Sequence, residues 1–174
     1  MPLLTLITPL FAALIIFTLP EKGHLLRTIV NLSVALIKLI LVVVMAWGIF
    51  HGVDYEIRFN MVPGVAFILK ADSLSIIFAS LSAVLWLLTI IYAVGYLENS
   101  ANRSRFFGFF SLCVASTMGV ALAGNLFTFF LFYEMLTLST YPLVVHRGTE
   151  QALKAGRTYI IYTLTGGAVL LLAI

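Results

Sequence analysis

Long apolar runs with almost no charged residues determine what this chain can fold into. Six runs follow one another, at Pro2–Leu19, Leu25–Phe50, Ser73–Leu97, Phe106–Ala123, Asn125–Val145 and from Thr158 onwards. A helix of about 20 apolar residues crosses the hydrocarbon core of a bilayer, which is roughly 30 Å thick. The sequence therefore predicts an all-α polytopic membrane protein with about six transmembrane helices.

The composition excludes several other classes of protein. Charged residues make up 10% of the chain and hydrophobic residues 62%, whereas soluble domains contain roughly 25% charged residues. The net charge of +3 is small and scattered between the runs, so we expect no nucleic-acid partner. The single cysteine, Cys113, excludes an internal disulfide and a multi-cysteine metal site. His24, His51 and His146 lie at or beyond the ends of the runs, so haem held between helices is excluded and no cofactor is expected.

Glu134 is the one acidic or basic residue in the run Asn125–Val145, and it lies near the middle of that run. A charge at that depth costs at least about 2.5–3.5 kcal/mol on insertion scales, and intramembrane acids commonly mark functional sites. Thr137 and Tyr141 follow one and two turns later on the same helix face. We interpret Glu134 as a proton-handling or ion-pairing acid. The alternative is a neutral glutamic acid that bonds to a neighbouring helix and serves only packing.

Lys38 lies close to the centre of the run Leu25–Phe50, with Asn31 two turns before it on the same face. A lysine near a helix end extends its stem to the interface, but the middle of this run is too far away. Lys38 is therefore a candidate second charge on a proton path. The alternatives are a tilted helix, or a lysine that contacts lipid headgroups or another subunit.

The polar connections contain local structural signals. Residues 51–72 form the longest connection, and its segment Tyr55–Phe59 alternates polar and apolar residues, as a short strand or hairpin arm does. Asp72 is predicted to cap the following helix. Residues 98–105 and 146–157 are predicted to be hydrophilic loops. Gly124-Asn125 leaves almost no loop, so the fourth and fifth spans should form a tight antiparallel pair.

Small residues recur in the fourth span, and hydroxyl groups recur in the last. The fourth span carries Ser111, Ala115, Gly119 and Ala123 at intervals of four, a pattern that lets membrane helices approach closely. In the last run, Thr158, Tyr162 and Thr165 share one face, with Gly166-Gly167 beneath. These hydroxyls either carry a water wire or bond across to the fifth span. The chain ends inside this apolar run, which favours part of a longer protein.

The distribution of basic residues predicts the orientation. The first, third and fifth connections carry Lys22, Arg27, Arg103, Arg105, Arg147, Lys154 and Arg157, while the second and fourth carry only Arg58 and Lys70. Basic residues concentrate in cytoplasmic loops. We therefore expect the odd-numbered connections in the cytoplasm and the N-terminus outside, in a prokaryotic plasma membrane.

From Ala71 onward the chain resembles the antiporter-like membrane subunits shared by Mrp-type multisubunit Na+/H+ antiporters and respiratory complex I. The matching residues are Ala71–Ser75 at the start of the third span, Gly124–Phe127 leading into Phe132–Glu134, the stretch Leu138–Val144, and Lys154, Tyr159 and Tyr162. The stretch from Glu134 to Tyr141 is most similar to the D-type member of the Mrp-type complexes. The M-type member of complex I and the membrane arms of energy-converting hydrogenases remain close alternatives.

The resemblance implies a fold of roughly fourteen helices with inverted repeats, of which this chain would be the N-terminal part. Residues 1–105 would be a three-helix segment and residues 106–174 the start of the first repeat. The resemblance also implies that the acid matching Glu134 pairs with a lysine on a broken seventh helix, beyond this chain. It assigns no role to Lys38, which lies outside the matching part.

We therefore predict a D-type, proton-translocating subunit of a cation/proton antiporter. Its partners would be other membrane subunits, the lipid bilayer and protons, with Na+ as the candidate coupled cation. The proton path would contain Glu134, with Lys38, Thr137, Tyr141 and Tyr162 as weaker candidates. The alternatives are a proton-pumping subunit of an NADH-quinone oxidoreductase or hydrogenase, and a structural subunit with no ion path.

Overall fold

A computed structural model describes residues 1–20, 23–62, 65–97 and 102–174. Six helices and a two-stranded antiparallel hairpin follow one another, with these bounds: α1 Pro2–Thr18, α2 His24–Phe50, β1 Tyr55–Val62, β2 Val65–Ala71, α3 Ser73–Tyr96, α4 Arg103–Ala121, α5 Leu126–Val144 and α6 Glu150–Leu172. Five helices, α2 to α6, are long and apolar enough to cross a membrane, and α1 is a shorter apolar helix of 17 residues. The predicted fold class is confirmed.

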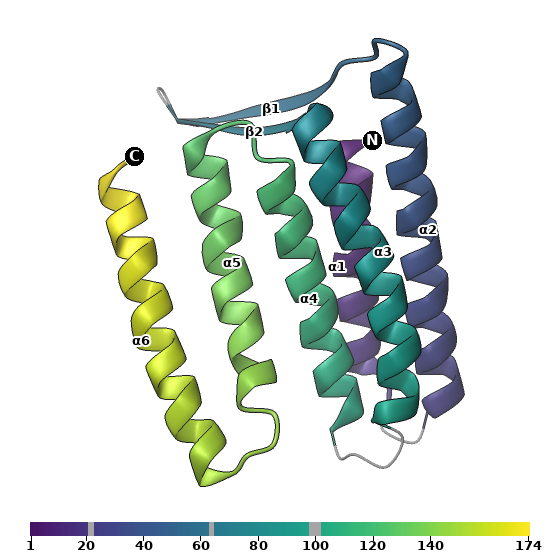
Figure 1. Cartoon of the computed structure of the whole chain (residues 1–174), viewed down its shortest axis with the longest axis vertical. Coiled ribbons are helices and arrows are strands. Elements are labelled where there is room, and N and C mark those ends of the chain that lie inside the picture. The colour runs from purple at the N-terminus through teal and green to yellow at the C-terminus, as the bar shows by residue number, and fades with distance from the viewer. Residues whose placement is uncertain (21–22, 63–64, 98–101) are drawn as a thin grey trace.

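Helix α4 occupies the centre of the bundle and packs against α1, α3 and α5. Its inner face carries the predicted small residues: Ser111, Ala115 and Gly119 are buried. A Cβ atom at Gly119 would overlap the ring of Phe132 on α5, so the two backbones approach more closely there than a larger residue would allow. On the outer side of α5, helix α6 completes a row of helices (Figure 1).

The hairpin lies across one end of the bundle (Figure 1) and is fastened to the turn between α4 and α5. Backbone bonds join Lys70 N to Leu122 O and Gly124 N to Ile68 O, both at 2.8 Å. The side chain of Asn125 caps α5 by accepting from Thr128 N at 2.9 Å, and it also donates to Ala66 O. These bonds fix where α5 begins, and therefore the position of each of its residues along the axis of the bundle.

Several local predictions are confirmed. The segment Tyr55–Phe59 lies in β1 and pairs with β2. Asp72 caps α3, because its Oδ1 accepts from the backbone N–H of Ser75 at 2.8 Å. The turn between α4 and α5 is as tight as predicted, since α4 ends at Ala121 and α5 begins at Leu126.

Two predicted loops are partly helical, which corrects the boundaries. Helix α4 begins at Arg103 rather than Phe106, and residues 98–101 of that connection lie outside the described part of the chain. Helix α6 begins at Glu150, well before Thr158. Its first turns are polar because they extend beyond the apolar run. They are stabilised by the Thr149 side chain, which accepts from Ala152 N, and by a Glu150–Lys154 ion pair of 3.8 Å.

Candidate functional site

Glu134 is the ninth of the 19 residues of α5, so it lies at mid-depth in the helix. Its side chain is half-buried and reaches the neighbouring helix α6. There it contacts Gly167: a Cβ atom at that position would overlap the Glu134 carboxylate. The carboxylate therefore occupies the space that any larger residue at 167 would fill. Gly166 differs, because the nearest atom to a Cβ there is the Tyr133 hydroxyl at 3.7 Å.

The contact between α5 and α6 repeats this pairing of a large residue with glycine. A Cβ atom at Gly156 would overlap Val145 and lie 3.1 Å from the ring of Tyr141. Gly156 and Gly167 are the two buried residues of α6. Between them, the hydroxyls of Thr140 and Tyr159 form a hydrogen bond that joins the two helices. The glycines thus set the antiparallel register that brings Glu134 against α6.

The weaker candidates occupy different positions around this contact. Thr137 is buried one turn from Glu134, and its hydroxyl donates to Tyr133 O at 3.1 Å. Tyr141 is half-buried against Gly156. Tyr162 is 75% exposed on α6, so this structure does not bring its hydroxyl to α5. The hydroxyls of Thr158 and Thr165 donate within α6, to Lys154 O and Ile161 O.

Lys38 is completely enclosed by its own chain. It is the 15th of the 27 residues of α2, and its side chain is 0% exposed. Its Nζ donates to Ser82 Oγ at 3.3 Å and lies 4.9 Å from the centre of the Trp86 ring. The interpretation in which Lys38 contacts lipid headgroups or another subunit is therefore wrong. The residue packs inward because its stem fits between α2 and α3.

The structure does not bring the two intramembrane charges together. Helix α2 packs against α1 and α3, whereas α5 packs against α4 and α6. Within the described residues, no salt bridge reaches Glu134 or Lys38. The two groups are therefore separate sites, one at each side of α4.

The sequence did not reveal which residues the side chains of Glu134 and Lys38 contact. It shows Gly167 only as part of a small-residue pair, and it assigns no role to Ser82. A glycine pair inside an apolar helix was the available signal, since small residues mark close helix approach. For Ser82, the signal was a polar residue at every seventh position of α3, in Ser75, Ser82 and Thr89.

Comparisons with known proteins match most of the part from the hairpin onward. Residues 64–107 match the family described as NADH-Ubiquinone oxidoreductase (complex I), chain 5 N-terminus. Residues 123–174, which contain Glu134 and Gly167, match the family described as NADH:quinone oxidoreductase/Mrp antiporter, TM. The chain belongs to the antiporter-like membrane subunit family. The resemblance seen in the sequence is thereby confirmed, and Lys38 lies outside both matched ranges.

Two relatives of this antiporter-like chain are components of Na(+)/H(+) antiporters. It is 21% identical to the D subunit of the antiporter from Bacillus subtilis (strain 168), over 99% of its own length and 35% of the relative's. It is 31% identical to the A1 subunit of the antiporter from Staphylococcus haemolyticus (strain JCSC1435), over 64% of its length and 14% of the relative's. The chain therefore spans about a third of the Bacillus subtilis relative.

Two solved structures share the fold. A chain of the membrane-bound sulfane sulfur reductase, an archaeal respiratory membrane complex, aligns with a TM-score of 0.82 at 19% identity, covering 96% of this chain and 34% of that one. A chain of the Mrp complex from Dietzia sp. DQ12-45-1b aligns with a TM-score of 0.74 at 21% identity, covering 99% and 19%. Both belong to multisubunit membrane complexes. The antiporter-like architecture thus extends over α1 and α2, which the family profiles do not match.

Proposed function

We propose that this chain takes part in proton translocation by a multisubunit cation/proton antiporter, as a D-type subunit, with Glu134 as the group that carries the charge. The observation that supports this proposal is the position of Glu134. A single acid at mid-depth contacts a glycine of the next helix and has no ion-pair partner among the described residues. A group placed in this way changes its charge state when a cationic partner approaches or leaves.

The surroundings of Glu134 support this role more than a packing role. An acid that serves packing in the membrane interior is expected to bond to a neighbouring helix, whereas Glu134 lies against a glycine and part of its side chain stays exposed. The uncovered side is where a partner cation would approach. The resemblance implies a lysine beyond this chain for that purpose, so the complete path needs the rest of the protein. The weaker path candidates Thr137 and Tyr141 flank this contact, while Tyr162 would act only through a group on the exposed side of α6.

A second candidate function is favoured by the family descriptions themselves. Both name a quinone oxidoreductase, and the membrane arm of such an enzyme would use the same acid with a redox driving force. Coupled transport in vesicles separates the two: an Na+-dependent pH change without a reductant indicates the antiporter. A pH change that requires electron transfer to a quinone indicates the oxidoreductase.

The test of Glu134 is ion flux in inverted membrane vesicles that contain the complete complex. Glu134→Gln keeps the shape of the side chain and removes its charge, so the complex should assemble normally. We expect coupled flux to fall by at least about tenfold, the scale of a lost proton-transfer group. Glu134→Asp, one methylene shorter, should retain a fraction of the flux.

Assembly is measured in the same membranes by the amount of complex. Normal flux in Glu134→Gln at normal complex content would overturn the proposal and leave Glu134 with a packing role.

The division into a three-helix segment, residues 1–105, and the start of a repeat, residues 106–174, is likewise a proposal. Residues 103–105 already belong to α4.

A further inference from the structure

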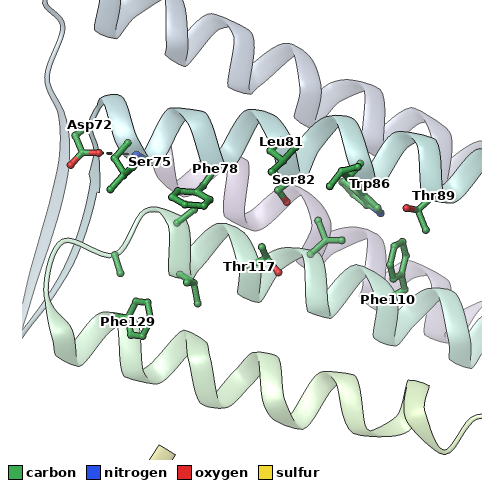
Figure 2. A pocket seen from close by; sticks show the side chains of 16 residues that line it. Asp72, Ser75, Phe78, Leu81, Ser82, Trp86, Thr89, Phe110, Thr117 and Phe129 are labelled. Carbon is green, nitrogen blue, oxygen red and sulfur yellow. Dashed lines mark hydrogen bonds between the residues drawn. The ribbon is translucent and has the colours of Figure 1, made fainter. Parts of the chain in front are cut away.

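A groove along α3 leads from the hairpin end of the bundle toward Lys38. Its cavity of about 650 Å³ lies between α3, α4 and the start of α5. Figure 2 shows Asp72, Ser75, Ser82, Trp86 and Thr89 following one another along α3, opposite Thr117 and Phe110 of α4. Spacings of three, four and seven residues keep these side chains on one helix face. We call this cavity the α3 groove.

An acidic side chain, Asp72, lies at the mouth of the α3 groove. The backbone N–H of Ser75 donates to Asp72 and holds the pKa of the Asp72 carboxyl below its usual value. Asp72 is exposed and precedes the first residue of α3, so it lies at the end of the membrane-spanning helix. At neutral pH the mouth therefore presents a carboxylate to water.

Lys38 lies behind the inner part of this groove. Ser82 lines the groove and also accepts the hydrogen bond from Lys38 Nζ, so its hydroxyl connects the two. Trp86 lines the groove as well, and its ring faces Lys38 Nζ at a distance that favours a cation. The Trp86 side chain is 1% exposed, and its Nε1 has no hydrogen-bond partner among the described residues.

The charge of Lys38 has no acidic partner in the helices around it. Helices α1, α2, α3 and α4 contain no Asp or Glu. A buried ammonium without a counter-charge requires water or other polar groups, because its desolvation is otherwise uncompensated. Ser82 both accepts the hydrogen bond of Lys38 and lines the α3 groove, so its hydroxyl connects the ammonium with the space in the groove.

We propose that the α3 groove is an aqueous half-channel from the hairpin end of the membrane to Lys38, and that Lys38 exchanges protons with its water through Ser82. In this step an N–H bond of the ammonium breaks as Ser82 Oγ takes the proton. The original hydroxyl proton of Ser82 passes to water, so the products are a neutral amine and a hydronium ion. This site is separate from Glu134 and does not depend on its role.

Cysteine labelling of the full-length protein in its complex tests the half-channel. Single cysteines at Ser75, Ser82 and Thr89, in a Cys113→Ser background, are treated with membrane-impermeant methanethiosulfonates from the hairpin side. The matched controls are Ile77, Val84 and Ile91, two residues further along α3 and on its exposed apolar face. We expect labelling at the groove positions and none at the controls. Absence of labelling at Ser82 would mean that lipid or protein fills the groove, and would overturn the proposal.

Reagent charge tests whether Lys38 is an ammonium beside the groove. In the Ser82→Cys variant, a nearby cation attracts the anionic sulfonate reagent and repels the cationic trimethylammonium reagent. Adding Lys38→Met should lower the anionic-to-cationic rate ratio by at least about threefold, since a local potential changes local reagent concentrations. An unchanged ratio would overturn the assignment of Lys38. If this double variant fails to fold, the labelling of the single-cysteine variants, which retain Lys38, still tests the half-channel.

Proton exchange is tested by changing the hydroxyl itself. Ser82→Ala removes the group between Lys38 and the groove water, whereas Ser82→Thr keeps a hydroxyl in the same place. We expect the proton flux of the complex to fall by at least about threefold in Ser82→Ala and to remain near normal in Ser82→Thr. Equal flux in both variants would overturn the exchange step. A flux that depends on Glu134 but not on Ser82 would leave the proposed function intact.

Discussion

Helices α1–α4 and the pair α5–α6 treat an intramembrane charge in opposite ways. In the first region Lys38 is fully enclosed between α2 and α3. This enclosed region covers its charge with side chains of its own helices. In the second region Glu134 is only partly buried, and α6 has two buried residues, Gly156 and Gly167. The α5–α6 pair leaves part of its acid exposed.

This difference indicates which substitutions should affect mainly stability and which should affect mainly function. A substitution at a close helix contact of α4 should act mainly on folding, because the side chains there are tightly packed and have little freedom to move. A substitution at the α5–α6 contact should act mainly on the position of Glu134, since the contact is narrow and one side of it is free. Four measurements test that separation, from the largest expected effect to the smallest.

Gly119→Val should produce the largest loss of stability. The new side chain would overlap the Phe132 ring at the centre of the α4–α5 contact, and overpacking of a tight contact costs about 1–3 kcal/mol. The thermal midpoint of the purified complex in detergent measures this loss. The double variant Gly119→Val with Phe132→Ala should recover part of the stability, and no recovery would contradict the steric explanation.

Gly167→Ala should reduce coupled flux with little effect on stability. The added methyl group overlaps only the end of the flexible Glu134 side chain, so the carboxylate moves and the helices stay in place. Displacing a reacting group by a fraction of its contact distance should lower flux about five- to tenfold. Gly166→Ala is the matched control, since its methyl group has space, and it should keep near-normal flux. Similar flux in both variants would show that Gly167 does not position Glu134.

Asp72→Ala should destabilise the start of α3, at the edge of the enclosed region. Loss of the side-chain bond to Ser75 N removes a helix cap, which costs about 1 kcal/mol. Asp72→Asn keeps the cap and should be near neutral for stability. A thermal midpoint that falls equally in both variants would indicate that the charge of Asp72, rather than its cap, is what stabilises α3.

His146 should give the smallest effect, a loss of stability in mild acid. Burial, and next the charge of Arg105, lower the pKa of His146 below its ordinary value of 6.5. The unfolded chain therefore takes up a proton at a higher pH than the folded chain. The stabilising contribution is complete above pH 6.5 and is lost as the pH falls through and below that value. Thermal midpoints in neutral and in mildly acidic buffer measure it, and His146→Gln should reduce the difference between them.

The sequence by itself determined the parts of this protein that depend on the bilayer and on local chemistry. Run length and hydropathy gave the order of the spans, because a helix must match the thickness of the hydrocarbon core. The Asp72 cap and the tight turn before α5 were also readable, since caps and turns involve neighbours in the chain. The early start of α6 was missed because hydropathy does not register helical turns outside the membrane.

Only the tertiary structure decided which residues the charged side chains of Glu134 and Lys38 contact. Helical periodicity gives the face of Glu134 or Lys38 but not the helix that it meets. Gly167 and Ser82 are 33 and 44 residues away from those charges in sequence, and close packing of helices brings each pair together. Interhelical packing depends on the shapes of whole faces, so a single sequence did not show that Lys38 is enclosed while Glu134 stays open to one side.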